Sequence, residues 1–230
     1  MKTVGVIGGM SWQSSKYYYQ YLNEIVAQKL GGSHSAKIIM SSVDFSEIER
    51  LSFEGNWDKI GRLMAMEAKR LEKSGADIII LATNTIHLVA KPIEKAISIP
   101  FLHIARATGT SIAKTKLKRV ALLGTQFTME RDFYTKILKD DFDLEVLTPE
   151  LEERNYLQEL IYNELVKGQF TEEANRKCLE IITRLEEKGA EGVILGCTEL
   201  SILIPSKAIS IPSFDTTKIH CLAAIDFAMN

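Results

Sequence analysis

Short apolar segments alternate with longer charged segments along the chain. The short ones are rich in Val, Ile and Leu, which is typical of buried parallel strands. They span Val4–Gly8, Lys37–Ser42, Asp77–Leu81, Phe101–Ile104, Val120–Gly124, Glu145–Leu147, Gly192–Leu195 and Pro212–Phe214. The longer ones have helical spacing and include Trp57–Lys73, Glu152–Lys167 and Thr171–Lys188. This alternation predicts an α/β protein with mostly parallel sheets flanked by helices.

The chain also contains an internal repeat. The segment Lys73–Thr85 (KSGADIIILATNT) resembles Glu187–Glu199 (EKGAEGVILGCTE), and the offset of 189 − 75 = 114 places Thr83 on Cys197. Flanking matches keep the same order at nearly the same offset: Val4–Gly8 with Val120–Gly124, and Ile99–Phe101 with Ile211–Ser213. We therefore expect two pseudo-symmetric lobes. The first comprises residues 1–98 plus 208–230, and the second comprises residues 99–207.

Composition narrows the class of protein. The 230 residues are 46% hydrophobic and 25% charged, with a formal net charge of −2, which indicates an ordinary globular chain with no bulk preference for nucleic acid or membrane. No apolar run approaches the roughly 20 residues of a membrane span, and the N-terminus does not resemble a signal peptide. Three cysteines, at 178, 197 and 221, do not suggest a disulfide framework. A reducing cytoplasm is the expected compartment.

Polar tripeptides follow the two matched strands of the repeat. They are Thr83-Asn84-Thr85 and Cys197-Thr198-Glu199. Ligands of parallel sheets bind beyond the carboxyl ends of strands, where the first N–H groups of the next helix also favour a thiolate. We expect the active site in the cleft between the lobes, with Thr83 and Cys197 on opposite sides of one small ligand. Cys178 and Cys221 lie in apolar or helical stretches and are interpreted as packing residues.

These motifs resemble those of a known family. Gly5-x-x-Gly8-Gly9-Met10, Asn84-Thr85-x-His87 and Gly196-Cys197-Thr198-Glu199 look like the signature of the aspartate/glutamate racemase superfamily. Further similarity, at Ser42–Phe45 and Val120–Thr125, extends the match over essentially the whole chain.

The resemblance implies a racemase that uses two cysteines and no pyridoxal phosphate or other cofactor. One thiolate removes the α-proton of an acidic amino acid, and the other thiol protonates the opposite face. The second family cysteine matches Cys197, whereas the first is replaced by Thr83. The resemblance also assigns substrate binding to Asn84, Thr85 and Thr198, places Met10 at the site, and implies a homodimer.

Replacing a thiol by an alcohol makes the two faces unequal. An unperturbed thiol has a pKa of about 8.5, whereas an alcohol is a far weaker acid and cannot serve as a resting anionic base. Thr83 can still donate a proton or relay one from water. In the family the second cysteine faces the α-proton of the L-enantiomer, so the hypothesis is an L-selective racemase of aspartate or glutamate.

Other polar residues are weaker candidates. A dicarboxylate substrate needs a cation for its distal group, for which Arg50 and Lys167 are candidates, with Ser52 as a neutral alternative. Each cation is also interpretable as a surface charge. Glu199 could orient Cys197 or favour the helix N-terminus. His87 is more typical of a packed or capping histidine.

Two rival functions remain open at this point. Arylmalonate decarboxylases of the same superfamily use a single cysteine, which is what this chain offers. A receptor that binds acidic amino acids without turnover is the rival from another class. Hydantoin racemases and maleate isomerases are expected to need the missing first cysteine. No G-x-G-x-x-G, P-loop, H-E-x-x-H or paired C-x-x-C motif supports dinucleotide, nucleotide or zinc chemistry.

Overall fold

A computed structural model describes all 230 residues and divides the chain into two compact units. Unit 1 comprises Met1–Ile104 and His220–Asn230, and unit 2 comprises Ala105–Ile219. These boundaries lie 104 − 98 = 6 and 219 − 207 = 12 residues later in the chain than those expected after residues 98 and 207. The first shifts because the Leu102 amide donates to the Ile79 carbonyl, at 2.9 Å. The second shifts because a further strand still pairs with the sheet of unit 2.

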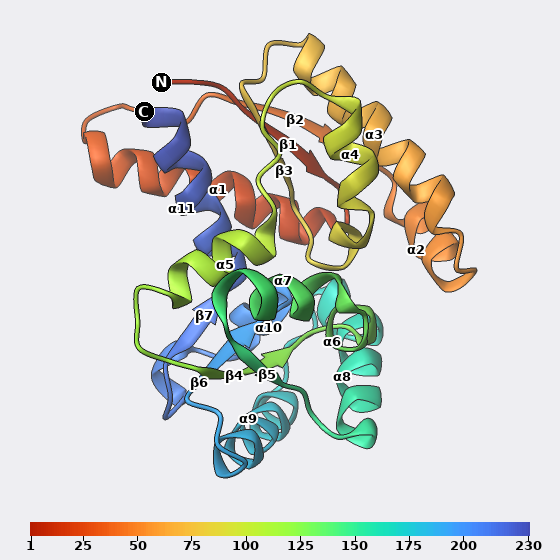
Figure 1. Cartoon of the computed structure of the whole chain (residues 1–230), viewed down its shortest axis with the longest axis vertical. Coiled ribbons are helices and arrows are strands. Elements are labelled where there is room, and N and C mark those ends of the chain that lie inside the picture. The colour runs from red at the N-terminus through yellow and green to blue at the C-terminus, as the bar shows by residue number, and fades with distance from the viewer. The chain divides into compact units, whose positions relative to one another are not determined.

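Unit 1 is built on a three-stranded parallel sheet of order β2-β1-β3 (Figure 1). Its strands are β1 (Val4–Gly8), β2 (Ile38–Ser42) and β3 (Ile78–Leu81). Its helices are α1 (Trp12–Leu30), α2 (Phe45–Phe53), α3 (Trp57–Lys73), the 3₁₀ helix η1 (Thr85–Val89), α4 (Ala90–Ala96) and most of α11 (Thr216–Met229).

Helices cover both faces of this sheet because side chains alternate along each strand. Val4 and Val6 of β1 pack in one cluster with residues of α1 and α11. Ile7, on the other face, packs in a second cluster with residues of α2, α3 and η1. All of these strand side chains are fully buried. Burial on both faces explains why the strands appear in the sequence as continuous apolar runs.

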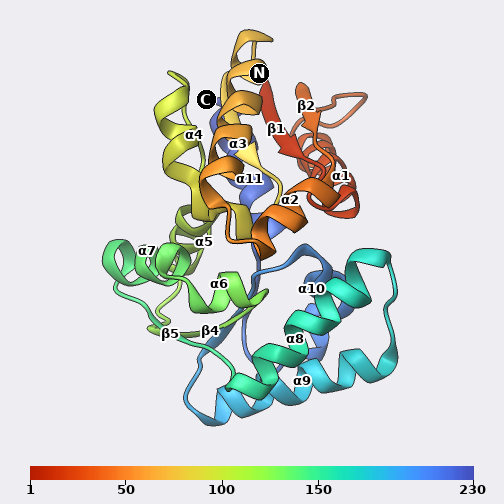
Figure 2. The same ribbon diagram turned by 90° about the vertical axis from the view of Figure 1, so that its right-hand side faces the viewer.

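Unit 2 is built on a four-stranded parallel sheet of order β5-β4-β6-β7. Its strands are β4 (Arg119–Leu123), β5 (Glu145–Leu147), β6 (Gly192–Leu195) and β7 (Ser213–Asp215). Its helical elements are α5 (Ile104–Ile112, which starts at the boundary), α6 (Gln126–Glu130), α7 (Asp132–Phe142), α8 (Leu151–Asn163), η2 (Leu165–Lys167), α9 (Glu172–Glu187), α10 (Thr198–Leu203) and η3 (Ser206–Ala208). Figure 2 shows α8 and α9 side by side, where they share one core cluster with β4 and β6.

The internal repeat is confirmed by equivalent topology and equivalent hydrogen bonds. Order β2-β1-β3 in unit 1 corresponds to β5-β4-β6 in unit 2. The amide of Ala82 donates to Ile7 at 2.8 Å, and its counterpart Gly196 donates to Leu123 at 2.7 Å. The two glycines before β3 and β6 share a φ of +95°.

Most predicted strands lie within a residue of their observed bounds, but the predicted strand Phe101–Ile104 is wrong. Only Phe101 makes a parallel bridge, to Ile79, and Ile104 already begins α5. The predicted helix over 152–167 is divided at Glu164 into α8 and η2. None of the helices combines the length and the apolar character that spanning a membrane requires.

Candidate active site

In unit 1, the predicted tripeptide lies at the carboxyl edge of the sheet. Thr83 lies two residues after the end of β3 and is half-buried, whereas Asn84 and Thr85 are buried, with 5% and 8% of their surface exposed. The 3₁₀ helix η1 begins at Thr85. The chain therefore passes from strand to helix at the tripeptide. Ligands of parallel sheets bind at this position, beyond the carboxyl ends of the strands.

A glycine turn lies at the same edge, after β1. Gly9 has a φ of +94°, and a Cβ atom there would lie 2.2 Å from the Val43 carbonyl oxygen. Its amide donates to the Ser15 hydroxyl at 2.7 Å, so the first turn of α1 holds the loop. Met10, predicted to line the site, is only 4% exposed and packs in the cluster of α2 and α3. The turn is thus fixed by close backbone approach, which only glycine permits.

Three buried histidines lie close to one another in unit 1. The ring of His87 is 4.7 Å from that of His103 and 5.7 Å from that of His220, measured between centroids. Burial, together with these two neighbours, holds the pKa of His87 well below its usual value. Burial also lowers the pKa of His220 to about 4. His103 and His220 are only 5% and 0% exposed, as is typical of histidines that pack in a core.

In unit 2, Cys197 occupies the equivalent position after β6. It is half-buried and forms the N-cap residue of α10, with extended backbone. Its carbonyl accepts the Leu200 amide at 3.1 Å. Its thiol donates to Oε2 of Glu199, at 3.0 Å, and the carboxylate is itself only 3% exposed. The thiol and the carboxylate therefore form a pair that is largely shielded from water.

The pKa of Cys197 is shifted upward, whereas the position at a helix N-terminus was expected to lower it. Burial of the sulfur raises the pKa well above its usual value, and the charge and hydrogen bond of Glu199 raise it further. The amides of Glu199 and Leu200 lower the pKa, but they do not compensate. A helix of six residues offers only a small dipole against a full negative charge at 3.0 Å. Cys197 is therefore a protonated thiol at neutral pH.

Threonine side chains lie in the segments next to this pair. Thr198 and Thr217 are joined through their hydroxyl oxygens at 2.9 Å, and Thr216 donates to the Leu195 carbonyl at 2.9 Å. Thr128 packs against Gly196, the residue before the cysteine. Neither Thr128 nor Thr216 was predicted from the sequence, although the repeat points to the segment after β4, where Thr128 lies.

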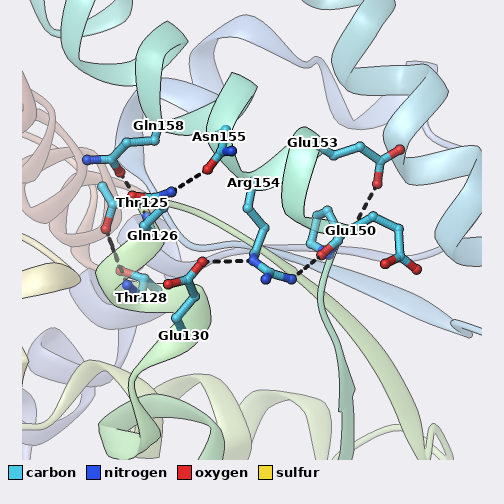
Figure 3. A network of polar contacts seen from close by, with 10 residues as sticks. Thr125, Gln126, Thr128, Glu130, Glu150, Glu153, Arg154, Asn155 and Gln158 are labelled. Carbon is cyan, nitrogen blue, oxygen red and sulfur yellow. Dashed lines mark hydrogen bonds and ion pairs between the residues drawn. The ribbon is translucent and has the colours of Figure 1, made fainter.

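A polar network supports that turn (Figure 3). The Gln126 amide donates to Gln158 at 2.8 Å, and Arg154 pairs with Glu130 at 2.9 Å. Both contacts join α6 to α8. Thr125, the N-cap of α6, is thereby held at the carboxyl end of β4, the strand that pairs with β6.

The three residues proposed to bind the distal carboxylate of the substrate differ in their surroundings. Arg50 is exposed and pairs with Glu54 of its own helix at 2.7 Å. The Ser52 hydroxyl is 4% exposed and donates to the carbonyl of Ile48, so it has a structural partner. Lys167 is exposed, makes no ion pair, and ends η2, which packs against α10. Of the three, only Lys167 combines an unpaired charge with an element that contacts the helix after the cysteine.

No group of three or more His, Cys, Asp or Glu side chains is arranged to hold a metal ion. The side chains of the two tripeptides can donate and accept hydrogen bonds, and the thiol can exchange its proton.

Comparison with known proteins gives consistent matches. The sequence model of the Asp/Glu/hydantoin racemase family matches residues 7–224. The broad specificity amino-acid racemase RacX of Bacillus subtilis (strain 168) is 28% identical over 173 residues, which cover 72% of this chain and 70% of RacX.

Two solved structures match along their full length. A putative Asp/Glu racemase from Yersinia pestis is 43% identical, with a TM-score of 0.93, and each chain is covered completely. PH1733, an aspartate racemase homologue from Pyrococcus horikoshii OT3, is 35% identical with a TM-score of 0.87, again with complete coverage of both chains. The resemblance drawn from the sequence motifs is confirmed.

Proposed function

Because the chain belongs to the Asp/Glu/hydantoin racemase family, we propose that it racemises acidic amino acids without a cofactor, with Cys197 as the base. The single observation that carries this proposal is the thiol–carboxylate pair of Cys197 and Glu199 at the carboxyl end of β6. The other two cysteines, Cys178 and Cys221, are fully buried. Cys197 is thus the one cysteine of the three that is not fully buried.

The proton steps balance without an oxidant or reductant. Glu199 first accepts the thiol proton, which leaves a thiolate at Cys197. The raised pKa that disfavours this thiolate also makes it a stronger base once formed. The thiolate then removes the α-proton of the L-amino acid. The Thr83 hydroxyl then donates a proton to the opposite face of Cα. Water restores the Thr83 hydroxyl, and the hydroxide that this leaves takes the proton from Glu199, which closes the cycle.

This arrangement makes the enzyme L-selective in rate. Thr83 can donate a proton, but as an alcohol it is a poor abstractor from the D-enantiomer. Detailed balance still fixes the overall equilibrium constant, so the selectivity concerns kcat and KM. Replacing Thr83 by Cys should therefore raise kcat in the D-to-L direction more than kcat in the L-to-D direction.

Substrate binding is assigned to groups of both units. Asn84, Thr85 and Thr198 would hold the α-carboxylate and α-amino groups, since all three lie buried at the strand ends. Lys167 is the better candidate for the distal carboxylate, because Arg50 is already neutralised by Glu54. A hydrogen bond to a charged group contributes about 1.5–3 kcal/mol.

Chiral chromatography of L-aspartate and L-glutamate reactions tests the proposal. D-enantiomer should form with the wild-type protein and not with Cys197→Ala, whereas Cys178→Ala, once shown to be folded by circular dichroism, should stay active. Equal kcat values for the two enantiomers at saturation would contradict the asymmetry, whereas their kcat/KM values have to be equal because the equilibrium constant of racemisation is 1. Release of CO₂ from methylphenylmalonate would instead favour a decarboxylase, and tight L-aspartate binding without turnover a receptor. The homodimer implied by the family is testable by sedimentation.

A further inference from the structure

The ring of His87 connects the Thr83 backbone to Ile104, the last residue of the first segment of unit 1. Its Nδ1 lies 2.7 Å from the Thr83 carbonyl oxygen, and the amide of Ile104 donates to its Nε2 at 3.2 Å. A backbone amide can only donate, so Nε2 has to be the acceptor. The proton of the neutral ring is therefore on Nδ1, which donates to Thr83.

The second unit shows which backbone bond this ring replaces. There, the Cys197 carbonyl accepts the amides of Leu200, at 3.1 Å, and Ser201, at 3.4 Å. The repeat offset places Ser201 on residue 201 − 114 = 87. In unit 1, the His87 amide bonds to Asn84 instead, at 3.1 Å. The ring thus gives the Thr83 carbonyl the hydrogen bond that helix amides give to Cys197.

The surroundings keep this ring fixed. His87 is only 1% exposed, and Phe101, His103 and His220 lie against it. The ring of His220 is itself held by the Tyr18 hydroxyl and the Leu102 carbonyl, both at 2.9 Å. A second proton on His87 would face the Ile104 amide, so the ring can hold this geometry only while it is neutral.

We infer that His87 is the positioning residue of Thr83. Its ring sets the orientation of the Thr83 peptide, and hence of the hydroxyl, and it ties that orientation to Ile104, the last residue before the chain enters unit 2. The inference rests on the proposed function, since it concerns delivery of a proton from the Thr83 side. It leaves abstraction by Cys197 unaffected.

Two amide substitutions separate the two hydrogen bonds of the ring. The side-chain nitrogen of His87→Asn lies near the position of Nδ1 and can still donate to Thr83. The terminal oxygen of His87→Gln lies near the position of Nε2 and can still accept from Ile104. If the bond to Thr83 is the one that matters, Asn will restore function and Gln will not.

The test is the fate of L-aspartate in D₂O. Protonation from the Cys197 side returns deuterated L-aspartate, and protonation from the Thr83 side gives deuterated D-aspartate. His87→Gln should lower the ratio of D to deuterated L product by about tenfold, corresponding to one lost hydrogen bond. His87→Asn should stay within about twofold of wild type. His220→Gln, which perturbs the same histidine cluster without contacting Thr83, should leave the ratio unchanged.

Other outcomes are equally informative. A wild-type ratio in His87→Gln, equal losses in the Gln and Asn variants, or the same loss in His220→Gln would each overturn the inference. The ratio is a property of folded molecules, so partial destabilisation does not mimic the effect. Should His87→Gln not fold, ¹⁵N spectra of the wild-type protein decide, because a proton on Nε2 of His87 would overturn the assignment. Absence of any exchange by the wild type would refute the proposed function instead.

Discussion

Replacing Glu199 by Gln should separate the acidity of Cys197 from its catalytic use. The substitution keeps the size of the side chain and removes the negative charge that lies 3.0 Å from the sulfur. That charge is one of the causes that raise the pKa of Cys197, and its removal lowers the pKa. The amide of the new Gln can also donate to the thiolate, which acts in the same direction.

The distance sets the size of the effect. One unit charge at 3.0 Å is worth about 1.4 kcal/mol at the dielectric constant of water and about 5.5 kcal/mol at an effective value of 20. Since 1.36 kcal/mol corresponds to one pKa unit, the pKa should fall by about 1 to 4 units. The fraction of Cys197 that is thiolate at neutral pH then increases tenfold for each pKa unit. The logarithm of the alkylation rate increases by only about half as much, because a thiolate of lower pKa is a weaker nucleophile.

The assay is the pH dependence of iodoacetamide alkylation, followed at Cys197 by peptide mass spectrometry. Burial raises the pKa of Cys178 to about 12, so this thiol does not interfere. The matched control is Glu191→Gln, which makes the same charge change at the opposite end of β6. Its carboxylate bonds to the Lys118 amide at 2.6 Å and not to sulfur, so the control should leave the alkylation profile in place.

Racemisation by Glu199→Gln should change in the opposite direction. Gln cannot accept the thiol proton, and a thiolate of lower pKa is a weaker base toward Cα. Alkylation at pH 7 therefore rises while racemisation falls. An alkylation pKa that stays unchanged or increases, or a shift of equal size in Glu191→Gln, would refute the role given to Glu199.

Three further predictions concern binding and stability. Lys167→Gln should raise the KM for L-aspartate by about 10- to 100-fold, whereas Arg50→Gln should change it less than twofold; similar effects would remove Lys167 as the distal cation. Gly9→Ala should lower the free energy of unfolding by about 4 kcal/mol, against about 1 kcal/mol for Gly55→Ala, because both have positive φ but only Gly9 meets a carbonyl at 2.2 Å; equal losses in urea denaturation would contradict this. The buried ring of His220 titrates at a pKa of about 4 when folded and about 6.5 when unfolded, so the unfolded chain binds the extra proton first. The free energy of unfolding should fall by up to about 3 kcal/mol as the pH decreases from about 6.5 to about 4. If His220→Gln shows the same dependence of this free energy on pH as the wild type, His220 is not the cause.

The fold was predictable because the repeat and the strand pattern carry the same information twice. Val4–Gly8 and Gly192–Leu195 have the predicted bounds, since strands buried on both faces appear as uninterrupted apolar runs. The failure at Phe101–Ile104 has a tertiary cause. The apolar residues there are buried by the start of a helix as well as by a strand bridge, and hydrophobicity alone does not separate the two.

The candidate residues were predictable, but their electrostatics were not. The positions of Thr83 and Cys197 follow from the repeat. The raised pKa of Cys197 depends on the Glu199 side chain turning back to a sulfur two residues earlier, which no spacing rule specifies. Likewise, the bond of His87 to the Ile104 amide, 17 residues away, becomes visible only once the chain is folded.

The most direct measurement of the central claim is the Cα–H proton signal of aspartate during incubation in D₂O. With the wild-type protein, L-aspartate should lose this signal at a much higher initial rate than D-aspartate, and Cys197→Ala should abolish the loss for both. Loss that persists in Cys197→Ala would contradict the assignment of the base, and an equal initial rate for the two enantiomers would contradict the division of labour between thiol and alcohol.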